Sequence, residues 1–93
     1  MKPTITIVYC TRCKWLTRAS WMAQELLTTF EEELGQVNLR PNQEGGVFDI
    51  YAEEDLIFSR REESRFPEIT ELKRLIRDRF FPERDLGHIE KTN

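Results

Sequence analysis

The sequence has few of the features that mark secreted, membrane or nucleic-acid-binding proteins. Near its start the longest purely aliphatic stretch is Ile7-Val8, too short for the apolar region of a signal peptide or for a membrane span. Asn-x-Ser/Thr glycosylation sites do not occur. A net charge of -3 and a pI of about 5.2 argue against general binding to nucleic acid or to a membrane surface. We therefore expect a cytoplasmic protein without nucleic-acid or membrane partners.

Cysteine and histidine are also scarce, and this limits metal chemistry. Two cysteines are too few for a disulfide-stapled scaffold, so their placement matters more than their number. A structural zinc site needs four ligands, whereas this chain offers one cysteine pair and one histidine, His88, in a predicted tail. We expect no intramolecular metal site and no bound cofactor. A zinc site shared within a dimer, or transient binding of a soft metal, stays open.

The chain does have enough apolar material for one small domain. Its 93 residues are 39% hydrophobic and 33% charged, a balance that supports a packed core and argues against disorder. No internal repeat, low-complexity segment or linker divides the chain. We predict a single domain over residues 1–93, with a core at about 4–81 and a tail at 82–93. The oligomeric state is left open, because exposed edge strands could pair.

The first half of the chain changes from strand to helix spacing and back. Residues 4–9 form a β-branched alternation that is typical of a strand. From Cys13 to Leu34 the apolar residues follow a helical period, and Gly35 has the place of a C′ glycine. This pattern predicts an amphipathic helix of roughly 20 residues. Residues 36–40 alternate again and predict a short strand that ends at Pro41.

The second half predicts a hairpin and a second helix. Residues 47–51 and 56–58 are strand-like runs, and the acidic stretch between them has the length of a hairpin loop. A polar connector, 60–65, leads to Pro67, which suits a first helical position, and an apolar helical stripe continues to Phe80. The order β-α-β-β-β-α predicts an α/β fold in which two helices accompany a four-stranded mixed sheet.

Cys10 and Cys13 form a Cys-x-x-Cys motif where the first strand gives way to the first helix. This spacing allows both sulfurs to sit in the first helical turn and to form a disulfide. The helix dipole, with Arg12, Lys14 and Arg18 nearby, would favour a thiolate. One thiolate that attacks and a neighbour that resolves the mixed disulfide make a reversible two-electron centre.

Topology predicts which loops accompany this motif. Parallel strands at 4–9 and 36–40 end at one edge of the sheet, where the Cys10–Cys13 turn lies. The loop 41–46 leaves from that edge and the loop 59–67 returns to it. We therefore expect three loops to converge on the two cysteines.

Several other residues allow both a functional and a plain structural interpretation. Trp15 and Trp21 could form a substrate platform, but partial burial in the core is the plainer expectation. Phe66 could reach the active edge, but a hydrophobic anchor before a helix N-terminus is the plainer expectation. Three arginines of the connector could attract an anionic thiol such as glutathione, or could belong to a solvated loop in which they alternate with glutamates. These are Arg60, Arg61 and Arg65.

The motif and its surroundings resemble a known family, the selenoprotein W-type thioredoxin-like proteins (the SelT/SelW/SelH or Rdx group). The resemblance covers about residues 4–81 and rests on Tyr9-Cys10-Thr11-Arg12-Cys13, Gly46-Val47-Phe48-Asp49-Ile50, Leu56-Ile57-Phe58-Ser59-Arg60, Phe66-Pro67-Glu68 and Leu72-Lys73. It implies a thioredoxin-like fold and a thiol redox role that uses glutathione or another thiol system.

Two departures accompany this resemblance. In selenium-containing members the second motif position is selenocysteine, and here it is Cys13, which implies slower, sulfur-based chemistry. Thioredoxins proper carry a proline facing the motif, where this chain has Gly45-Gly46.

The sequence thus predicts a thiol–disulfide oxidoreductase with Cys10 and Cys13 as its catalytic residues. Its substrates would be protein or small thiols, with glutathione or thioredoxin as the linked thiol system. Greater exposure at the helix start would make Cys10 the attacking residue, whereas the family resemblance favours Cys13. Two alternatives remain at this point: a redox-sensing adaptor that binds a protein partner without turnover, and soft-metal binding through the same cysteines.

Overall fold

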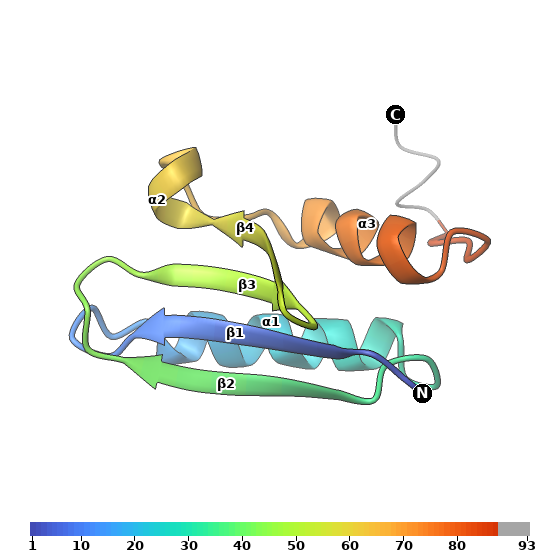
Figure 1. Ribbon diagram of the computed structural model, residues 1–93, viewed down its shortest axis with the longest axis horizontal. Coiled ribbons are helices and arrows are strands. Elements are labelled where there is room, and N and C mark those ends of the chain that lie inside the picture. Colours follow the sequence, from blue (N-terminus) through green and yellow to red (C-terminus); the bar gives the residue numbers. More distant parts are fainter. Residues whose placement is uncertain (88–93) are drawn as a thin grey trace.

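The apolar periods of the sequence produce a mixed sheet with helices, described here for residues 1–87 of a computed structural model (Figure 1). The predicted β-α-β-β-β-α order is confirmed, with one additional helical turn, α2, inside the predicted polar connector. Along the chain the elements are β1 (Thr4–Cys10), α1 (Leu16–Thr29), β2 (Gln36–Asn42), β3 (Phe48–Ala52), β4 (Asp55–Ser59), α2 (Arg60–Glu63) and α3 (Ile69–Phe80). His88, discussed above as a metal ligand, lies outside the described residues.

The sheet has the strand order β2-β1-β3-β4. Parallel pairing of β1 with β2 runs from Thr4 opposite Gln36 to Cys10 opposite Asn42, so both strands end level at one edge of the sheet. β3 pairs antiparallel with β1 and with β4. The strand β2 continues through Pro41, beyond its predicted end, because an edge strand tolerates a residue without an N–H.

Both long helices pack on the same face of the sheet. Figure 1 shows α1 behind β1 and β2, with α3 beside β4. The core contains alternate residues of the central strands together with the apolar stripes of α1 and α3. Its largest wholly buried side chains include Ile5, Ile7, Phe48, Ile50, Met22, Leu26, Phe30, Leu72 and Ile76. This arrangement leaves the carboxyl ends of β1 and β2 free to carry loops.

The first helix is shorter than its apolar spacing predicts. It ends at Thr29, and Phe30 and Leu34 are buried from a turn that follows the helix. Gly35 donates its N–H to the carbonyl of Pro3 at 2.8 Å. A β-carbon at Gly35 would lie 2.9 Å from the carbonyl oxygen of Lys2, so this glycine permits a close approach of two backbones. It does not serve as the expected C′ residue.

The last helix also begins later than predicted. Its N-cap is Glu68, so Pro67 precedes the helix, and the Glu68 N–H donates to the Glu71 carboxylate at 3.2 Å. The segment 82–87, expected to be a tail, packs on the domain: Leu86 is buried, and Arg84 donates to the carbonyl of Thr29 at 2.5 Å. Within residues 1–87 no helix is long and apolar enough to cross a membrane.

Candidate active site

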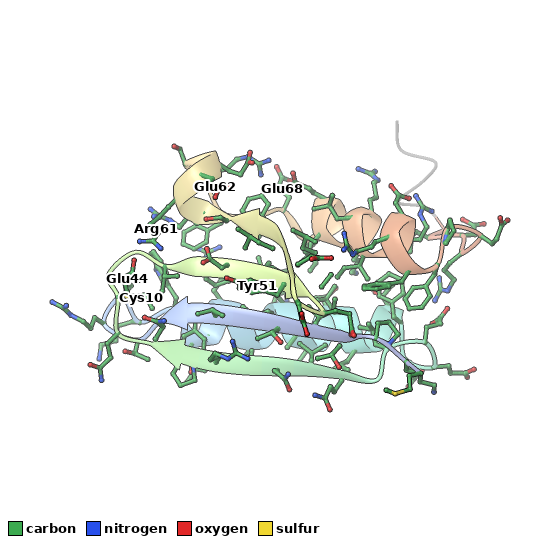
Figure 2. The ribbon with its side chains drawn as sticks, in the orientation of Figure 1. Cys10, Glu44, Tyr51, Arg61, Glu62 and Glu68 are labelled. Atoms are coloured by element: carbon green, nitrogen blue, oxygen red, sulfur yellow. A yellow bond between two sulfur atoms is a disulfide. The ribbon has the colours of Figure 1, made fainter. Side chains whose placement is uncertain are left out.

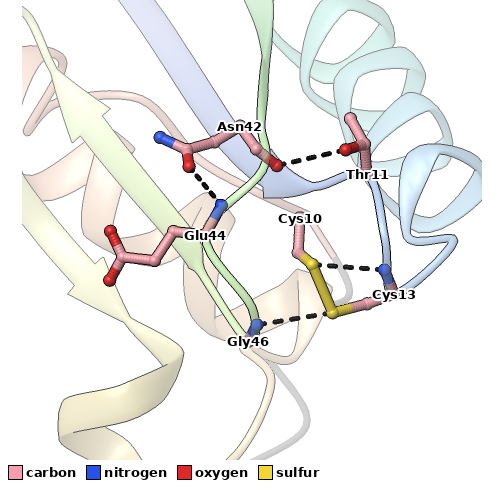
Figure 3. The surroundings of a disulfide bond; sticks show 6 residues. All are labelled: Cys10, Thr11, Cys13, Asn42, Glu44 and Gly46. Carbon is pink, nitrogen blue, oxygen red and sulfur yellow. Dashed lines mark hydrogen bonds between the residues drawn. A yellow bond between two sulfur atoms is a disulfide. The ribbon is translucent and has the colours of Figure 1, made fainter.

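The structure brings the two predicted cysteines together at the carboxyl end of β1. Cys10 is the last residue of this strand, and Cys13 lies in the turn that follows it. The two residues form a disulfide with their Cα atoms 5.4 Å apart (Figure 3). This Cα separation lies within the usual range for a disulfide.

The motif precedes the helix and does not form its first turn. Helix α1 begins at Leu16 with Trp15 as its N-cap, and Lys14 has a left-handed backbone with φ of 64°. The sulfurs therefore receive their hydrogen bonds from elsewhere. The N–H of Cys13 donates to Cys10 Sγ at 3.2 Å. Because such a donor stabilises a thiolate more than a thiol, the turn takes over the role expected of the helix dipole.

Burial differs sharply between the two sulfurs, in the sense opposite to the one expected. Cys10 is wholly buried, with an exposed fraction of 0%, whereas Cys13 is partly exposed. The expectation that Cys10 is the more exposed residue is wrong. Its strand is central in the sheet, so Cys10 packs in a small apolar cluster with Val8 and Val47. Cys13 is therefore the more accessible of the two cysteines.

The loop that follows β2 faces the disulfide, as the topology predicted. The N–H of Thr11 donates to the carbonyl of Asn42 at 2.9 Å, which fixes the motif to the end of β2. Gly46 has a φ of 82° and donates its N–H to Cys13 Sγ at 3.3 Å (Figure 3). The Gly45-Gly46 segment thus stands where thioredoxins carry a proline, and it offers an N–H that proline would lack. No sequence pattern indicated this donor.

Three aromatic side chains pack together beside the motif and form what we call the aromatic wall. The third loop contributes one of them, Phe66. Trp15, Phe48 and Phe66 pack edge to face, with ring centroids 4.8 Å apart for Trp15 and Phe66 and 5.3 Å apart for Phe48 and Phe66. Trp15 and Phe66 are half-buried, so both belong to the core while bordering the motif. Trp21 is 47% exposed, so the expectation that it is partly buried in the core is wrong.

The three connector arginines differ in their partners. Arg61 pairs with Glu44, and Figure 2 shows this pair near Cys10 at the end of the sheet. Arg65 binds both carboxylate oxygens of Glu71, at 2.8 and 2.7 Å, and these hydrogen bonds lower the pKa of Glu71. A solvated, ion-paired loop is therefore the correct description for these two.

The third connector arginine, Arg60, has a different environment. Its guanidinium carbon lies 4.9 Å from the ring centroid of Trp15 and 5.1 Å from that of Phe66. Ion pairing depends on contacts between distant segments, so Arg60 could not be distinguished from Arg61 and Arg65 by its position in the loop.

Metal ligands do not gather at this site. Over the part of the chain that the structure describes, no three His, Cys, Asp or Glu side chains come together in a way that could hold a metal ion. The groups that the structure places at the site are the two sulfurs, the N–H groups aimed at them and the nearby arginines.

A disulfide between the end of a central strand and the helix that follows, on a four-stranded mixed sheet, defines a thioredoxin-like protein with a Cys-x-x-Cys motif. The model of the Rdx family matches residues 4–78, and the chain belongs to this family. The match includes the motif and ends within α3, and it confirms the selenoprotein W-type resemblance.

Two solved bacterial structures support the same assignment. A selenoprotein W-related protein from Vibrio cholerae is 42% identical, with a TM-score of 0.82, over 86% of this chain and 99% of that one. A protein from Bordetella parapertussis is 48% identical, with a TM-score of 0.81, over 85% of this chain and 99% of that one. No curated protein sequence matches the chain.

Proposed function

We propose that the protein is a thiol–disulfide oxidoreductase in which Cys13 attacks and Cys10 resolves. The observation that carries this proposal is the unequal burial of the disulfide, with Cys10 at 0% exposure and Cys13 partly exposed. A substrate sulfur can approach only the exposed partner. The buried partner is held within the motif, where it can attack the mixed disulfide before the substrate leaves.

The proposed reaction balances as a two-electron exchange. The Cys13 thiolate attacks one sulfur of a disulfide RSSR, so that a Cys13–SR bond forms, the substrate disulfide breaks and the first RS⁻ leaves. Cys10 then loses its proton to solvent and attacks Cys13 Sγ, which closes the Cys10–Cys13 disulfide and releases the second RS⁻. Two electrons pass from the cysteines to the substrate, and protonation yields two thiols. A cellular thiol of the glutathione or thioredoxin type then reduces the pair again.

Hydrogen bonds at the site support the roles given to the two sulfurs. The Gly46 N–H, 3.3 Å from Cys13 Sγ, would stabilise this sulfur as the attacking thiolate and as the leaving group when the pair is reduced. The Cys13 N–H, 3.2 Å from Cys10 Sγ, would do the same for Cys10 during resolution. We place the reaction in the cytoplasm, where thiol systems keep such a pair in exchange between its two states.

The first test is the redox midpoint of the pair together with trapping of the mixed disulfide. Equilibration in graded glutathione buffers, acid quenching, alkylation and mass spectrometry should give one two-electron transition between roughly -200 and -300 mV. Cys10→Ser should accumulate a glutathione adduct on Cys13. The matched variant Cys13→Ser should form little adduct on the buried Cys10. Absence of an intramolecular disulfide across this range contradicts the function, and an adduct mainly on Cys10 contradicts the order of attack.

A redox-dependent adaptor is the second candidate, and exposed apolar side chains favour it. Leu16 is 51% exposed and Trp21 47% exposed, both on α1 and close to the motif. A partner protein could bind there in one redox state only. The double variant Cys10→Ser/Cys13→Ser separates the candidates: an adaptor retains partner binding as a mimic of the reduced state, whereas an oxidoreductase loses all turnover.

A further inference from the structure

Arg60 occupies an unusual position for a charged side chain next to a redox motif. It begins α2 directly after β4, and its guanidinium lies beside the rings of Trp15 and Phe66. Its Nε is buried and has no hydrogen-bond partner. Among residues 1–87 no carboxylate forms an ion pair with Arg60, whereas the next arginine, Arg61, pairs with Glu44. Arg60 is therefore a half-buried cation that no carboxylate of residues 1–87 neutralises, so its positive charge is available to an anionic ligand.

A second arginine meets the same ring from helix α1. The guanidinium carbon of Arg18 lies 3.8 Å from the ring centroid of Phe66. Arg18 likewise has no carboxylate partner within the described part of the chain. Stacking on an aromatic ring holds a guanidinium in place while leaving its N–H groups free to bind a ligand. Two guanidinium groups therefore contact one ring, and an anion bound beside either of them would offset its positive charge.

Contacts along the loop place this pair of arginines next to the reactive sulfur. A β-carbon built on Gly46 would lie 3.8 Å from Nη1 of Arg60, and the N–H of the same glycine donates to Cys13 Sγ at 3.3 Å. Trp15, on which Arg60 stacks, follows Cys13 by only two positions. A ligand bound by Arg60 would thus extend along this loop toward Cys13, the sulfur exposed to solvent.

We infer that Arg18 and Arg60 bind a carboxylate group carried by the disulfide substrate. The inference rests on the proposed function and adds the substrate class: small peptidic disulfides with carboxylates near the sulfurs. Planar guanidinium forks match a carboxylate with two parallel hydrogen bonds, and these charge-assisted bonds are among the stronger ones in proteins. The site would orient the substrate so that one of its sulfurs faces Cys13. Both arginines are binding residues, and neither takes part in electron transfer.

The kinetic test compares disulfides that differ in charge. Reduced protein is mixed with glutathione disulfide, neutral hydroxyethyl disulfide or cationic cystamine, and oxidation of the cysteine pair is followed by acid quenching and alkylation. The wild type should prefer the carboxylate-bearing disulfide. Arg60→Gln should lower its rate constant for glutathione disulfide about tenfold, and Arg18→Gln about threefold, since Arg18 is the more exposed. Rates with hydroxyethyl disulfide should stay within about twofold, because that substrate forms no carboxylate contact.

Two further variants distinguish a specific binding site from the overall electrostatic attraction of the protein for anions. Arg40→Gln removes the same charge from β2, away from the aromatic wall, and should change the glutathione disulfide rate by less than about twofold. Arg60→Lys keeps the charge but loses the planar fork, and should recover only part of the rate. Equal losses for Arg60→Gln and Arg40→Gln, or equal losses with anionic and neutral disulfides, would overturn the inference.

A binding measurement that needs no turnover separates this inference from the proposed function. S-methylglutathione, which cannot exchange disulfides, is titrated into the oxidised protein while NMR follows the arginine Nε–H and Trp15 indole signals. Shifts confined to Arg18, Arg60 and Trp15 support the binding site. If these shifts occur but the protein reduces no disulfide, only the proposed oxidoreductase activity is refuted. Absence of these shifts overturns the site whatever the turnover. If Arg60→Gln fails to fold, the solvent-exposed Arg18→Gln decides the kinetic comparison.

Discussion

Replacement of Gly46 by alanine should lower the reduction potential of the disulfide. Gly46 has a φ of 82°, a left-handed conformation that an L side chain adopts at a cost of about 1–2 kcal/mol. The added β-carbon itself would meet only Arg60 Nη1, at an ordinary 3.8 Å. The loop can relieve the strain by rotating to a negative φ, and that rotation turns the Gly46 N–H away from Cys13 Sγ.

The size of the effect follows from the hydrogen bond that is lost. The Gly46 N–H lies 3.3 Å from Cys13 Sγ in the oxidised state and would bind the thiolate more strongly after reduction. A hydrogen bond to a charged acceptor exceeds one to a neutral acceptor by about 1 kcal/mol. Its loss destabilises the reduced form by that amount, which corresponds to a decrease of about 20 mV for a two-electron couple. The unfolding free energy of the oxidised protein should also fall by about 1 kcal/mol, because the rotated loop loses its hydrogen bond to the disulfide sulfur.

Gly45→Ala provides the matched control. A β-carbon at Gly45 would meet no atom within 4 Å, so this variant adds the same methyl group one residue away. Both variants are titrated in glutathione buffers, and the oxidised and reduced fractions are measured after alkylation. We expect a more negative midpoint for Gly46→Ala and an unchanged one for Gly45→Ala. A midpoint that stays constant or rises in Gly46→Ala would refute the role given to this N–H.

Two further predictions concern stability. Leu72→Ala should lower the free energy of unfolding by about 3 kcal/mol in urea denaturation, because Leu72 has an exposed fraction of 0% in the core, and a loss below about 1 kcal/mol would contradict its packing role. Glu71→Gln should cost about 0.5–1 kcal/mol at pH 7, because the hydrogen bonds from Arg65 lower the pKa of Glu71. A carboxylate with a lowered pKa stabilises the fold above its ordinary value of 4.5, and this contribution is lost as the pH falls through the folded-state pKa. Urea curves of wild type and variant should therefore differ at pH 7 and converge near pH 3, and a constant difference would rule out this pair as the cause.

Elements whose signal is local were predictable from the sequence. Strict alternation in residues 4–9 fixes one face of β1 toward the core, and the helical stripe fixes the buried side of α1. The start of α1 was not predictable. The Lys14 N–H donates to the Thr11 carbonyl at 3.1 Å, and the left-handed Lys14 redirects the chain before the helix. Neither feature alters the spacing of apolar residues, so a prediction from periodicity places the start of the helix at Cys13 instead of Leu16.

Features that depend on partners from distant segments were beyond the sequence. The motif itself could be found, because strand, cysteine pair and helix are adjacent in the chain. The burial of Cys10 arises from strands on either side of β1, so the more exposed cysteine could not be identified from local position. Arg60 and Arg61 are neighbours in the chain, and only the folded structure gives one an aromatic wall and the other a carboxylate.

The short span of the disulfide limits how much it stabilises the fold. A crosslink across two intervening residues restricts the unfolded chain little, by about 2 kcal/mol, and much longer loops gain more. Backbone bonds such as Thr11 N–H to the Asn42 carbonyl, at 2.9 Å, hold the turn whether or not the sulfurs are joined. The disulfide therefore adds less stability to the fold than a crosslink across a long loop would. A protein partner that senses the state of the disulfide would meet it at Cys13, the more accessible of the two cysteines.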